Sequence, residues 1–161
     1  MAENLIISTG SKDEVYQTLL SQIEHLLAGE TNLIANLANI SSAIEMTFGF
    51  LWVGFYLKES EGQLVLGPFQ GPIACTRIQK GKGVCGTAWS ENRTVIVQNV
   101  NDFTGHIACS SASVSEIVVP FYSSTGNFLG VLDIDSKEES SFDEVDQLYL
   151  EKLILILSKT I

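Results

Sequence analysis

Basic residues are scarce in this sequence. Nine lysines and arginines stand against nineteen aspartates and glutamates, which gives a formal net charge of -10 at pH 7. A surface this acidic repels the phosphate groups of nucleic acids, and the chain contains no cluster of Lys and Arg to offset the repulsion. The charge balance therefore argues against a nucleic-acid-binding protein.

Long apolar runs and a recognisable targeting signal are also missing. The longest purely aliphatic run, Leu153 to Leu157, is far shorter than the roughly 20 apolar residues that a membrane-spanning helix needs. The first residues, MAEN, lack the basic segment followed by an apolar segment that marks a secretory signal. We therefore expect a cytoplasmic protein without a membrane partner.

Cysteine is scarce too, and the three cysteines, Cys75, Cys85 and Cys109, are odd in number. An odd count in a cytoplasmic chain argues against a framework of structural disulfides. Three interpretations of the cysteines remain: they are inert buried thiols, they bind a metal, or they carry out redox chemistry. Zinc bound by these cysteines and His106 would lack the C-x-x-C spacing typical of structural zinc sites. We therefore expect no bound metal.

The residues that are present suit one folded domain. Apolar residues make up 45% of the 161 positions, which is enough for a hydrophobic core, so we expect a single domain over residues 1–161. Apolar residues recur at helical spacing after Ser11, in a helix that ends at Gly29, and in a second helix that begins near Thr31. A helix-capping pattern at Ser141 predicts a last helix that runs to the end of the chain.

Between these helices the chain has the aromatic and β-branched composition of strands. Most links between the predicted strands are short, which favours antiparallel pairing. The sequence therefore predicts an α+β domain with one antiparallel sheet. The terminal helices pack on one face, and the long middle segments, with a site, lie on the other. The predicted strands are Phe50–Leu57, Leu64–Phe69, Ile73–Ile78, Val95–Val97, Ile117–Tyr122 and Phe128–Ile134.

The segment Gly81 to Gly86 matches the G-x-G-x-x-G pattern of dinucleotide-binding loops. In such proteins the pattern follows the first strand of a parallel β-α-β unit and opens a full helix. Here two strands come first, and the short helix predicted over Thr87–Glu91 ends within about two turns. We interpret the glycines instead as a tightly turned backbone that presents Cys85 to another segment.

Cys109 is the predicted nucleophile of a redox enzyme. It lies in a long polar loop that runs from Asn99 to Ser115, and loops commonly carry chemistry. His106 precedes it by three residues, and a nearby imidazolium would favour the thiolate; equally, the ring would only hydrogen-bond the loop. Cys75 falls in a predicted apolar strand, where an inert buried thiol is an equally good interpretation.

Two carboxylates lie on one predicted strand. Asp133 and Asp135 flank Ile134, so both side chains point to the same face of the sheet. If buried, they need a partner; otherwise they belong to a solvent-exposed strand end. Glu116 opens the neighbouring strand and would complete a cluster that suits an ammonium group. One member held protonated would serve as a general acid.

Several segments together resemble the free methionine-(R)-sulfoxide reductases, enzymes built on a single GAF domain. The resemblance covers most of the chain and includes all three cysteines at the family's spacing. The family commonly has Pro at the position of Thr104 and Asp at that of Ser110, departures that affect local loop geometry. The resemblance implies a six-stranded antiparallel sheet and a homodimer formed through the helices. The matching segments are residues 71–78, 81–89, 105–109, 115–120 and 130–136.

The same resemblance assigns roles to individual residues. It implies that Cys109 is the catalytic cysteine and that Cys85 and Cys75 are resolving or recycling thiols. Aromatic residues form one wall of the family's substrate pocket and carboxylates bind the substrate, with Glu116 and Asp135 also implied in catalysis. The residues that match this pocket are Trp52, Tyr56, Glu116, Asp133 and Asp135.

The activity implied is the reduction of free L-methionine-(R)-sulfoxide to methionine. Cys109 would attack the sulfoxide sulfur, become a sulfenic acid and form a disulfide with a second thiol. Thioredoxin, an external dithiol, would then restore the thiols, so no bound cofactor is expected. The alternatives are a non-catalytic GAF domain that binds a small ligand or senses redox state, and a dimerisation module built on the terminal helices.

Overall fold

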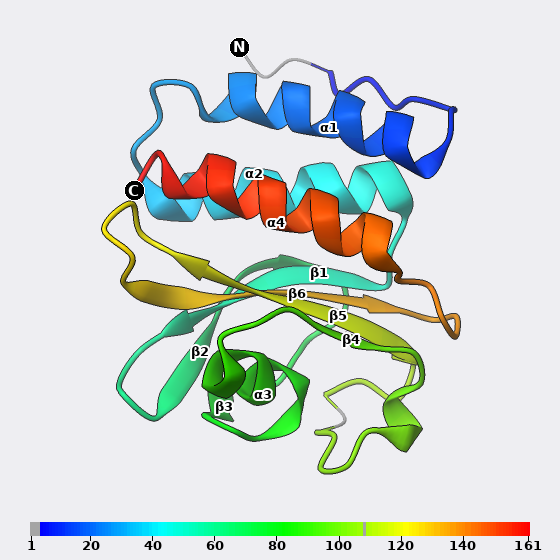
Figure 1. Cartoon of the computed structure of the whole chain (residues 1–161), viewed down its shortest axis with the longest axis vertical. Helices are drawn as coiled ribbons and strands as arrows, with labels where there is room; N and C mark the ends of the chain where they lie inside the picture. Colours follow the sequence, from blue (N-terminus) through cyan, green and yellow to red (C-terminus); the bar gives the residue numbers. More distant parts are fainter. Residues whose placement is uncertain (1–3, 108) are drawn as a thin grey trace.

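An antiparallel sheet runs through the middle of the molecule (Figure 1). The computed structural model describes residues 4–107 and 109–161. Within them, in chain order, lie α1 (Lys12–Leu27), α2 (Leu33–Phe48), β1 (Trp52–Lys58), β2 (Gln63–Gln70), β3 (Arg77–Gln79), α3 (Gly83–Glu91), β4 (Val95–Val97), the short 3-10 helix η1 (Val100–Asp102), β5 (Ser115–Tyr122), β6 (Phe128–Ser136) and α4 (Glu144–Ser158).

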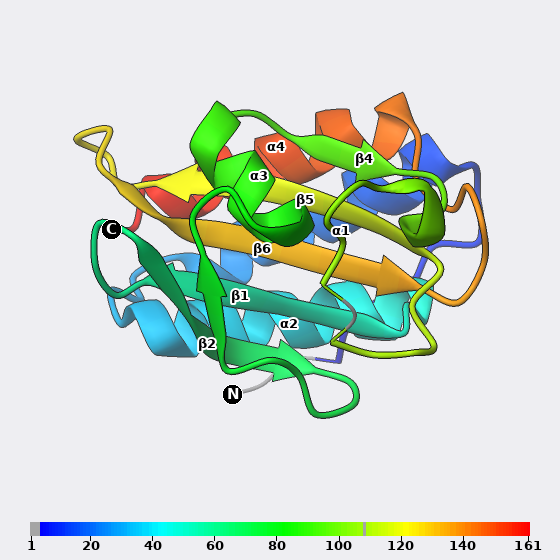
Figure 2. The same cartoon turned by 90° about the horizontal axis from the view of Figure 1, so that it is seen from below.

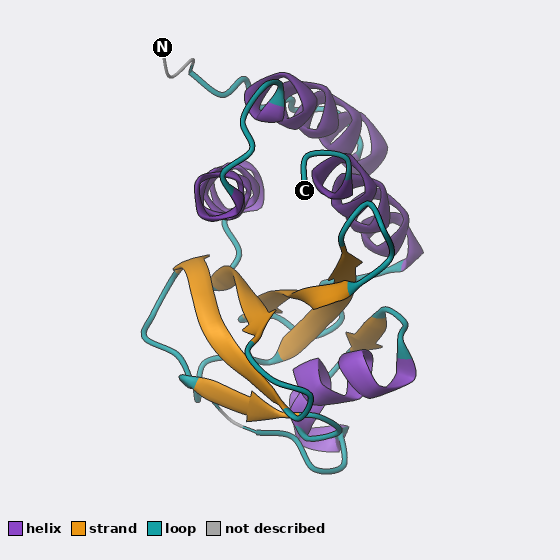
Figure 3. Ribbon diagram, turned by 90° about the vertical axis from the view of Figure 1, so that its left-hand side faces the viewer, coloured by secondary structure: helices purple, strands orange, loops and turns teal. Residues whose placement is uncertain are grey.

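The six strands follow the order β3-β2-β1-β6-β5-β4, and every neighbouring pair is antiparallel. Helices α2 and α4 lie against one face, and α1 packs across them as an outer layer (Figures 1 and 3). Helix α3 and the loop between β4 and β5 lie on the opposite face (Figure 2). The predicted α+β class, the antiparallel six-stranded sheet and the placement of the terminal helices are confirmed.

Local capping chemistry defines the helix ends. Ser11 caps α1 in a capping box, as predicted. Asn32 caps α2, which ends at Gly49 in the left-handed conformation with φ 67°. The predicted cap of the last helix is wrong: Asp143 caps α4, and its side chain accepts hydrogen bonds from two backbone amides of the first turn. The hydroxyl of Ser141 is instead 2.7 Å from the Ser136 hydroxyl.

The third predicted strand is also wrong over most of its length. Only Arg77–Gln79 pairs with β2, and the segment before it leaves the sheet. Gly71 turns the chain with a φ of 126°, and the Ile73 side chain is 91% exposed rather than packed in a core. Cys75 therefore lies in a loop, not in an apolar strand.

Two apolar cores fill the space on either side of the sheet. The larger core, beneath α1, α2 and α4, includes Leu132 and Ile134 of β6. The smaller core, beneath α3, includes Val131 of the same strand. Because side chains alternate along a strand, Asp133 and Asp135 project toward the smaller core. The alternation of β6 thus places two carboxylates on the α3 face.

A buried polar network joins α1 to α4. Asp146 is fully buried and accepts hydrogen bonds from the Tyr16 hydroxyl at 2.7 Å and from Lys12 Nζ at 2.6 Å. The Tyr16 ring stacks on Tyr149, with ring centroids 5.2 Å apart. A buried carboxylate is stable only with such partners, so this network orients α1 on α4. Among the helices of the described ranges, none has the length and apolar character needed to span a membrane.

Candidate active site

Figure 2 shows α3 and the loop before β5 on the same face of the sheet. A pocket on this face is lined by residues of α3, of the loop before β3 and of the loop before β5. Its floor is formed by β1, β5 and β6, and the first turn of α3 closes one side. Seven of the eight predicted site residues line it, and the eighth, Cys75, is bonded to one of the seven. The seven are Trp52, Tyr56, Cys85, Cys109, Glu116, Asp133 and Asp135.

Two of the three cysteines form a disulfide at the edge of the pocket, which Cys109 lines. Cys75 and Cys109 are joined, with 5.2 Å between their Cα atoms and 34 residues between them in sequence. Both are half-buried and lie on loops. Cys85, at the start of α3, is a free thiol and is buried, with 3% of its surface exposed. The structure thus pairs the predicted nucleophile with Cys75.

The glycine pattern before Cys85 has a clear structural basis. Gly81 and Gly83 turn the chain with φ values of 76° and 62°. Helix α3 begins at Gly83, four residues earlier than predicted. At Gly86 a Cβ atom would lie 2.3 Å from the carbonyl oxygen of Gln79, so only glycine permits this close approach of α3 to β3. The glycines present Cys85 to the pocket, as the sequence predicted.

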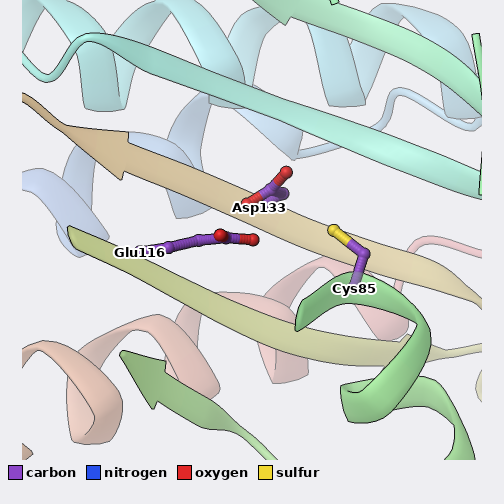
Figure 4. Close-up of side chains that lie close together, drawn as sticks. All are labelled: Cys85, Glu116 and Asp133. Atoms are coloured by element: carbon purple, nitrogen blue, oxygen red, sulfur yellow. The ribbon is translucent and has the colours of Figure 1, made fainter. Parts of the chain in front are cut away.

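Three carboxylates, Glu116, Asp133 and Asp135, line the pocket together with Cys85. Figure 4 shows two of them, Glu116 and Asp133, beside the Cys85 sulfur. Glu116 pairs with Asp135 across β5 and β6, and Asp133 lies two residues along the same face. Glu116 and Asp133 are each only 6% exposed, so the alternative of a solvent-exposed strand end is wrong for Asp133. Among the described residues, no salt bridge joins either group to a lysine or arginine. The cluster therefore lacks a strong cationic partner.

Burial changes how these carboxyl groups titrate. Desolvation and repulsion from the neighbouring carboxylates raise the pKa of Glu116 and of Asp133 well above the usual range. Desolvation raises the pKa of Asp135 to about 6, although a hydrogen bond from the Ser113 hydroxyl opposes the rise. Carboxyl groups with raised pKa values keep protons near neutral pH, so the cluster contains a proton donor.

The two titratable groups nearest this cluster are uncharged at neutral pH. Burial and the adjacent carboxylates raise the pKa of the Cys85 thiol. Burial lowers the pKa of His106, so its ring is neutral at pH 7 and offers no positive charge to Cys109. His106 faces the carboxylates instead, with its Nδ1 atom 4.0 Å from Glu116 Oε2.

The aromatic side chains of Trp52 and Tyr56, which line the pocket, also hold the loop before β3 in place. The rings of Trp52 and Tyr56 stack, with centroids 5.8 Å apart, and both side chains are buried. Trp52 Nε1 donates a hydrogen bond to the carbonyl oxygen of Pro72 at 3.1 Å. The Tyr56 hydroxyl donates to the carbonyl oxygen of Cys75 at 2.9 Å. The same two side chains therefore shape the pocket and position the loop that carries Cys75.

Comparison with known proteins identifies the family. The GAF domain profile matches residues 30–158. The free methionine-R-sulfoxide reductase of Saccharomyces cerevisiae is 46% identical over 93% of this chain and 87% of its own length. The Escherichia coli protein of the same name is 45% identical over 94% of this chain and 91% of its own. This chain belongs to the GAF-domain family of free methionine-R-sulfoxide reductases.

A solved structure from this reductase family supports the assignment. The free methionine-R-sulfoxide reductase from Neisseria meningitidis, solved in complex with its substrate, is 50% identical to this chain. The two structures superpose with a TM-score of 0.95 over 99% of this chain and 95% of the other. The predicted family and its GAF fold are thereby confirmed.

In this member of the reductase family, the sequence alone missed part of the pocket wall. Lys82 lines the pocket as the residue before α3, and its side chain makes no capping hydrogen bond to the helix. The first backbone amides of α3, at the positive end of the helix dipole, therefore have no side-chain cap, and the residues that carry them, Gly83, Val84 and Cys85, line the pocket. Ser113 and Ile107 also line the pocket. The glycine-rich turn before a helix was the available signal for an anion-accepting helix start.

Proposed function

We propose that this chain reduces free L-methionine-(R)-sulfoxide to methionine. One observation carries the proposal: buried carboxylates, which have no lysine or arginine partner among the described residues, line a pocket together with Cys109, which is bonded to Cys75. Buried carboxylates need a cation, and a free amino acid supplies one as its ammonium group. The names of the yeast, Escherichia coli and Neisseria meningitidis relatives support the same activity.

The pocket offers a complementary surface to each part of this substrate. Glu116 and Asp133 would receive the ammonium group, and Trp52 and Tyr56 would contact the S-methyl end. The uncapped first turn of α3 would receive the substrate carboxylate. A methionine sulfoxide within a protein has a neutral amide in place of the ammonium, so the pocket favours the free amino acid.

The reduced pocket supplies a nucleophile and an acid. The Cys109 thiolate attacks the sulfoxide sulfur, and a carboxylic acid of the cluster protonates the oxygen. Asp135 suits this step because its pKa is about 6. The oxygen passes to Cys109 as a sulfenic acid while the sulfoxide becomes methionine. A second thiol then condenses with the sulfenic acid, releasing water and forming a disulfide such as Cys75–Cys109.

Regeneration requires an external dithiol, for which we propose thioredoxin. Cys75 is half-buried on a loop and follows the exposed Ile73, so its sulfur lies nearer the surface than that of buried Cys85. Cys85 would act as a further recycling thiol after a shift of the loops. The cycle uses only cysteines and thioredoxin, so we propose that the chain needs no bound cofactor. We also propose that it acts in the cytoplasm as a homodimer formed through its helices.

The decisive experiment compares free with N-acetylated methionine sulfoxide. Wild type should use only the free amino acid. Asp133→Asn should lower kcat/KM by roughly 30- to 900-fold, the equivalent of about 2–4 kcal/mol of transition-state stabilisation. Equal use of both substrates by wild type would overturn the ammonium pocket.

Cysteine variants test the thiol chemistry. Cys109→Ser should abolish turnover even with excess dithiothreitol, because the other cysteine that lines the pocket among the described residues, Cys85, is a buried thiol whose pKa is raised. Peptide mapping of substrate-oxidised wild type should find Cys109 bonded to Cys75 or Cys85. Sulfinic acid at Cys109 without any disulfide would argue against a resolving thiol. Binding of substrate without turnover in wild type would favour the sensor alternative.

A further inference from the structure

Three atoms that could bind a metal ion, one sulfur and two carboxylate oxygens, lie close together in the pocket (Figure 4). Cys85 of α3, Glu116 of β5 and Asp133 of β6 each direct one sulfur or oxygen atom toward the same point. These three atoms lie within 4.8 Å of one another. All three residues are buried, with at most 6% of their surface exposed. Side chains from three separate elements thus form one compact, desolvated cluster.

Two buried polar atoms at this cluster lack hydrogen-bond partners. Within the described part of the chain, neither Asp133 Oδ1 nor His106 Nδ1 makes a hydrogen bond. The His106 nitrogen lies 4.0 Å from Glu116 Oε2, and His106 lines the same pocket. Buried polar atoms are nearly always paired, so two unpaired atoms on residues that line the same pocket indicate a missing partner.

The proposed substrate does not account for every donor. An ammonium group hydrogen-bonds to carboxylate oxygens and has no need of the Cys85 sulfur or of a neutral imidazole nitrogen. The disulfide joins Cys75 to Cys109 and leaves Cys85 as a free thiol. Sulfur, nitrogen and carboxylate oxygen are the donors that zinc takes in proteins, whereas magnesium and calcium take oxygen.

The spacing suits a tetrahedral ion after a small adjustment. Zinc bonds of about 2.0–2.3 Å place the ligand atoms of a tetrahedral site roughly 3.3–3.8 Å apart. The three donor atoms, within 4.8 Å of one another, need to close by about 1 Å, which side-chain rotation supplies. The pocket provides an entry path because Cys85, His106 and both carboxylates all line it.

We propose that Cys85, Glu116 and Asp133, with His106 as a fourth ligand, bind a zinc ion when the pocket holds no substrate. The Cys85 thiol, and whichever of Glu116 and Asp133 is protonated, transfer their protons to buffer as the bonds to zinc form, and no group is oxidised or reduced. The ion occupies the carboxylates that would receive the substrate ammonium. Zinc is therefore a reversible competitor of the substrate, a consequence that rests on the proposed function.

Cobalt(II) is the direct probe, because it enters zinc sites and, unlike zinc, absorbs light when bound to sulfur. Protein with the Cys75–Cys109 disulfide intact has Cys85 as its remaining thiol. It should bind one cobalt ion per chain, with sulfur-to-cobalt charge-transfer absorption that excess zinc removes. Absence of this absorption in wild type would overturn the proposal.

Matched variants separate this site from the other sulfurs. The double variant Cys75→Ser, Cys109→Ser leaves Cys85 untouched and should keep the charge-transfer absorption, whereas Cys85→Ser should lose it. The opposite pattern would overturn the proposal, even if one variant were poorly folded. Asp133→Asn should weaken cobalt binding by at least about tenfold, and Asp102→Asn, an exposed control, should leave it unchanged within about twofold.

Titration with free methionine sulfoxide then separates the two proposals. If free methionine sulfoxide displaces the cobalt ion, the ion and the amino acid bind in the same pocket. If it does not, the proposal that zinc competes with the substrate is overturned. If the protein binds cobalt at Cys85 but does not reduce the sulfoxide, the metal site is supported and the proposed function is refuted. If the protein reduces the sulfoxide but shows no sulfur-to-cobalt absorption, only the proposed metal site is refuted.

Discussion

Replacing Asp135 by asparagine should stabilise the protein while impairing it as an enzyme. Asp135 lies in the pocket opposite Glu116, and its one hydrogen-bond donor among the described side chains is the Ser113 hydroxyl. Burial raises its pKa from 3.8 to about 6. The ionised side chain thus lies in a partly desolvated pocket and forms no salt bridge with a lysine or arginine among the described residues. Asparagine keeps the shape and the acceptor oxygen for Ser113 but carries no charge.

The magnitude follows from the shift in pKa. A rise from 3.8 to about 6 is about 2 units, which corresponds to about 3 kcal/mol of unfavourable free energy in the ionised folded state. Between these pH values the folded state binds the proton more tightly than the unfolded state does. The free energy of unfolding therefore falls as pH rises from about 4 to about 6, and the full loss of about 3 kcal/mol is present above about pH 6.

Urea unfolding of wild type and Asp135→Asn, at several pH values, measures this effect. Near pH 8 the variant should be more stable by about 2–3 kcal/mol, and near pH 4 the two proteins should be nearly equal. Asp102→Asn, at an exposed position on η1, should differ from wild type by less than about 0.5 kcal/mol throughout. A stability difference independent of pH, or a destabilised Asp135→Asn variant near pH 8, would refute the reasoning.

Two further predictions concern the framework. Tyr16→Phe removes a hydroxyl that donates to buried Asp146 and should cost about 2 kcal/mol of unfolding free energy, whereas Tyr149→Phe loses bonds only to exposed side chains and should cost less than about 1 kcal/mol. Urea unfolding of both variants checks this, and equal losses would contradict it. Gly130→Ala places a Cβ atom 2.1 Å from a carbonyl oxygen of β1 and should cost about 3 kcal/mol or more. Gly62→Ala, where nothing lies within 4 Å, is its thermal-unfolding control and should melt close to wild type.

The parts of the fold that depend on local chemistry were predictable from sequence. The start of α1 followed from the capping box at Ser11, and the sheet face of Asp133 and Asp135 followed from strand alternation. The same capping pattern at Ser141 gave the wrong cap for α4, because the Ser141 hydroxyl hydrogen-bonds to Ser136 in the folded chain and Asp143 caps the helix instead.

The parts that depend on distant contacts were not predictable. Residues 73–76 belong to the predicted strand Ile73–Ile78, but the Cys75–Cys109 bond and the hydrogen bonds from Trp52 and Tyr56 hold the segment that contains them as a loop. Likewise, the choice of Cys75 over Cys85 as the partner of Cys109 depends on two loops that meet only in the folded chain. Sequence placed the reactive residues in one site, and tertiary packing paired them.

Alternate residues of strand β6 pack in the core and line the pocket, which restricts the insertions and deletions that the strand tolerates. Leu132 and Ile134 pack under the helices while Asp133 and Asp135 face the pocket. A single inserted or deleted codon in this strand would exchange the two sets and ruin both at once. The neighbouring turn, residues 123–127, is largely exposed and carries neither function, so it can vary in length. Natural length variation should therefore collect in that turn and avoid β6.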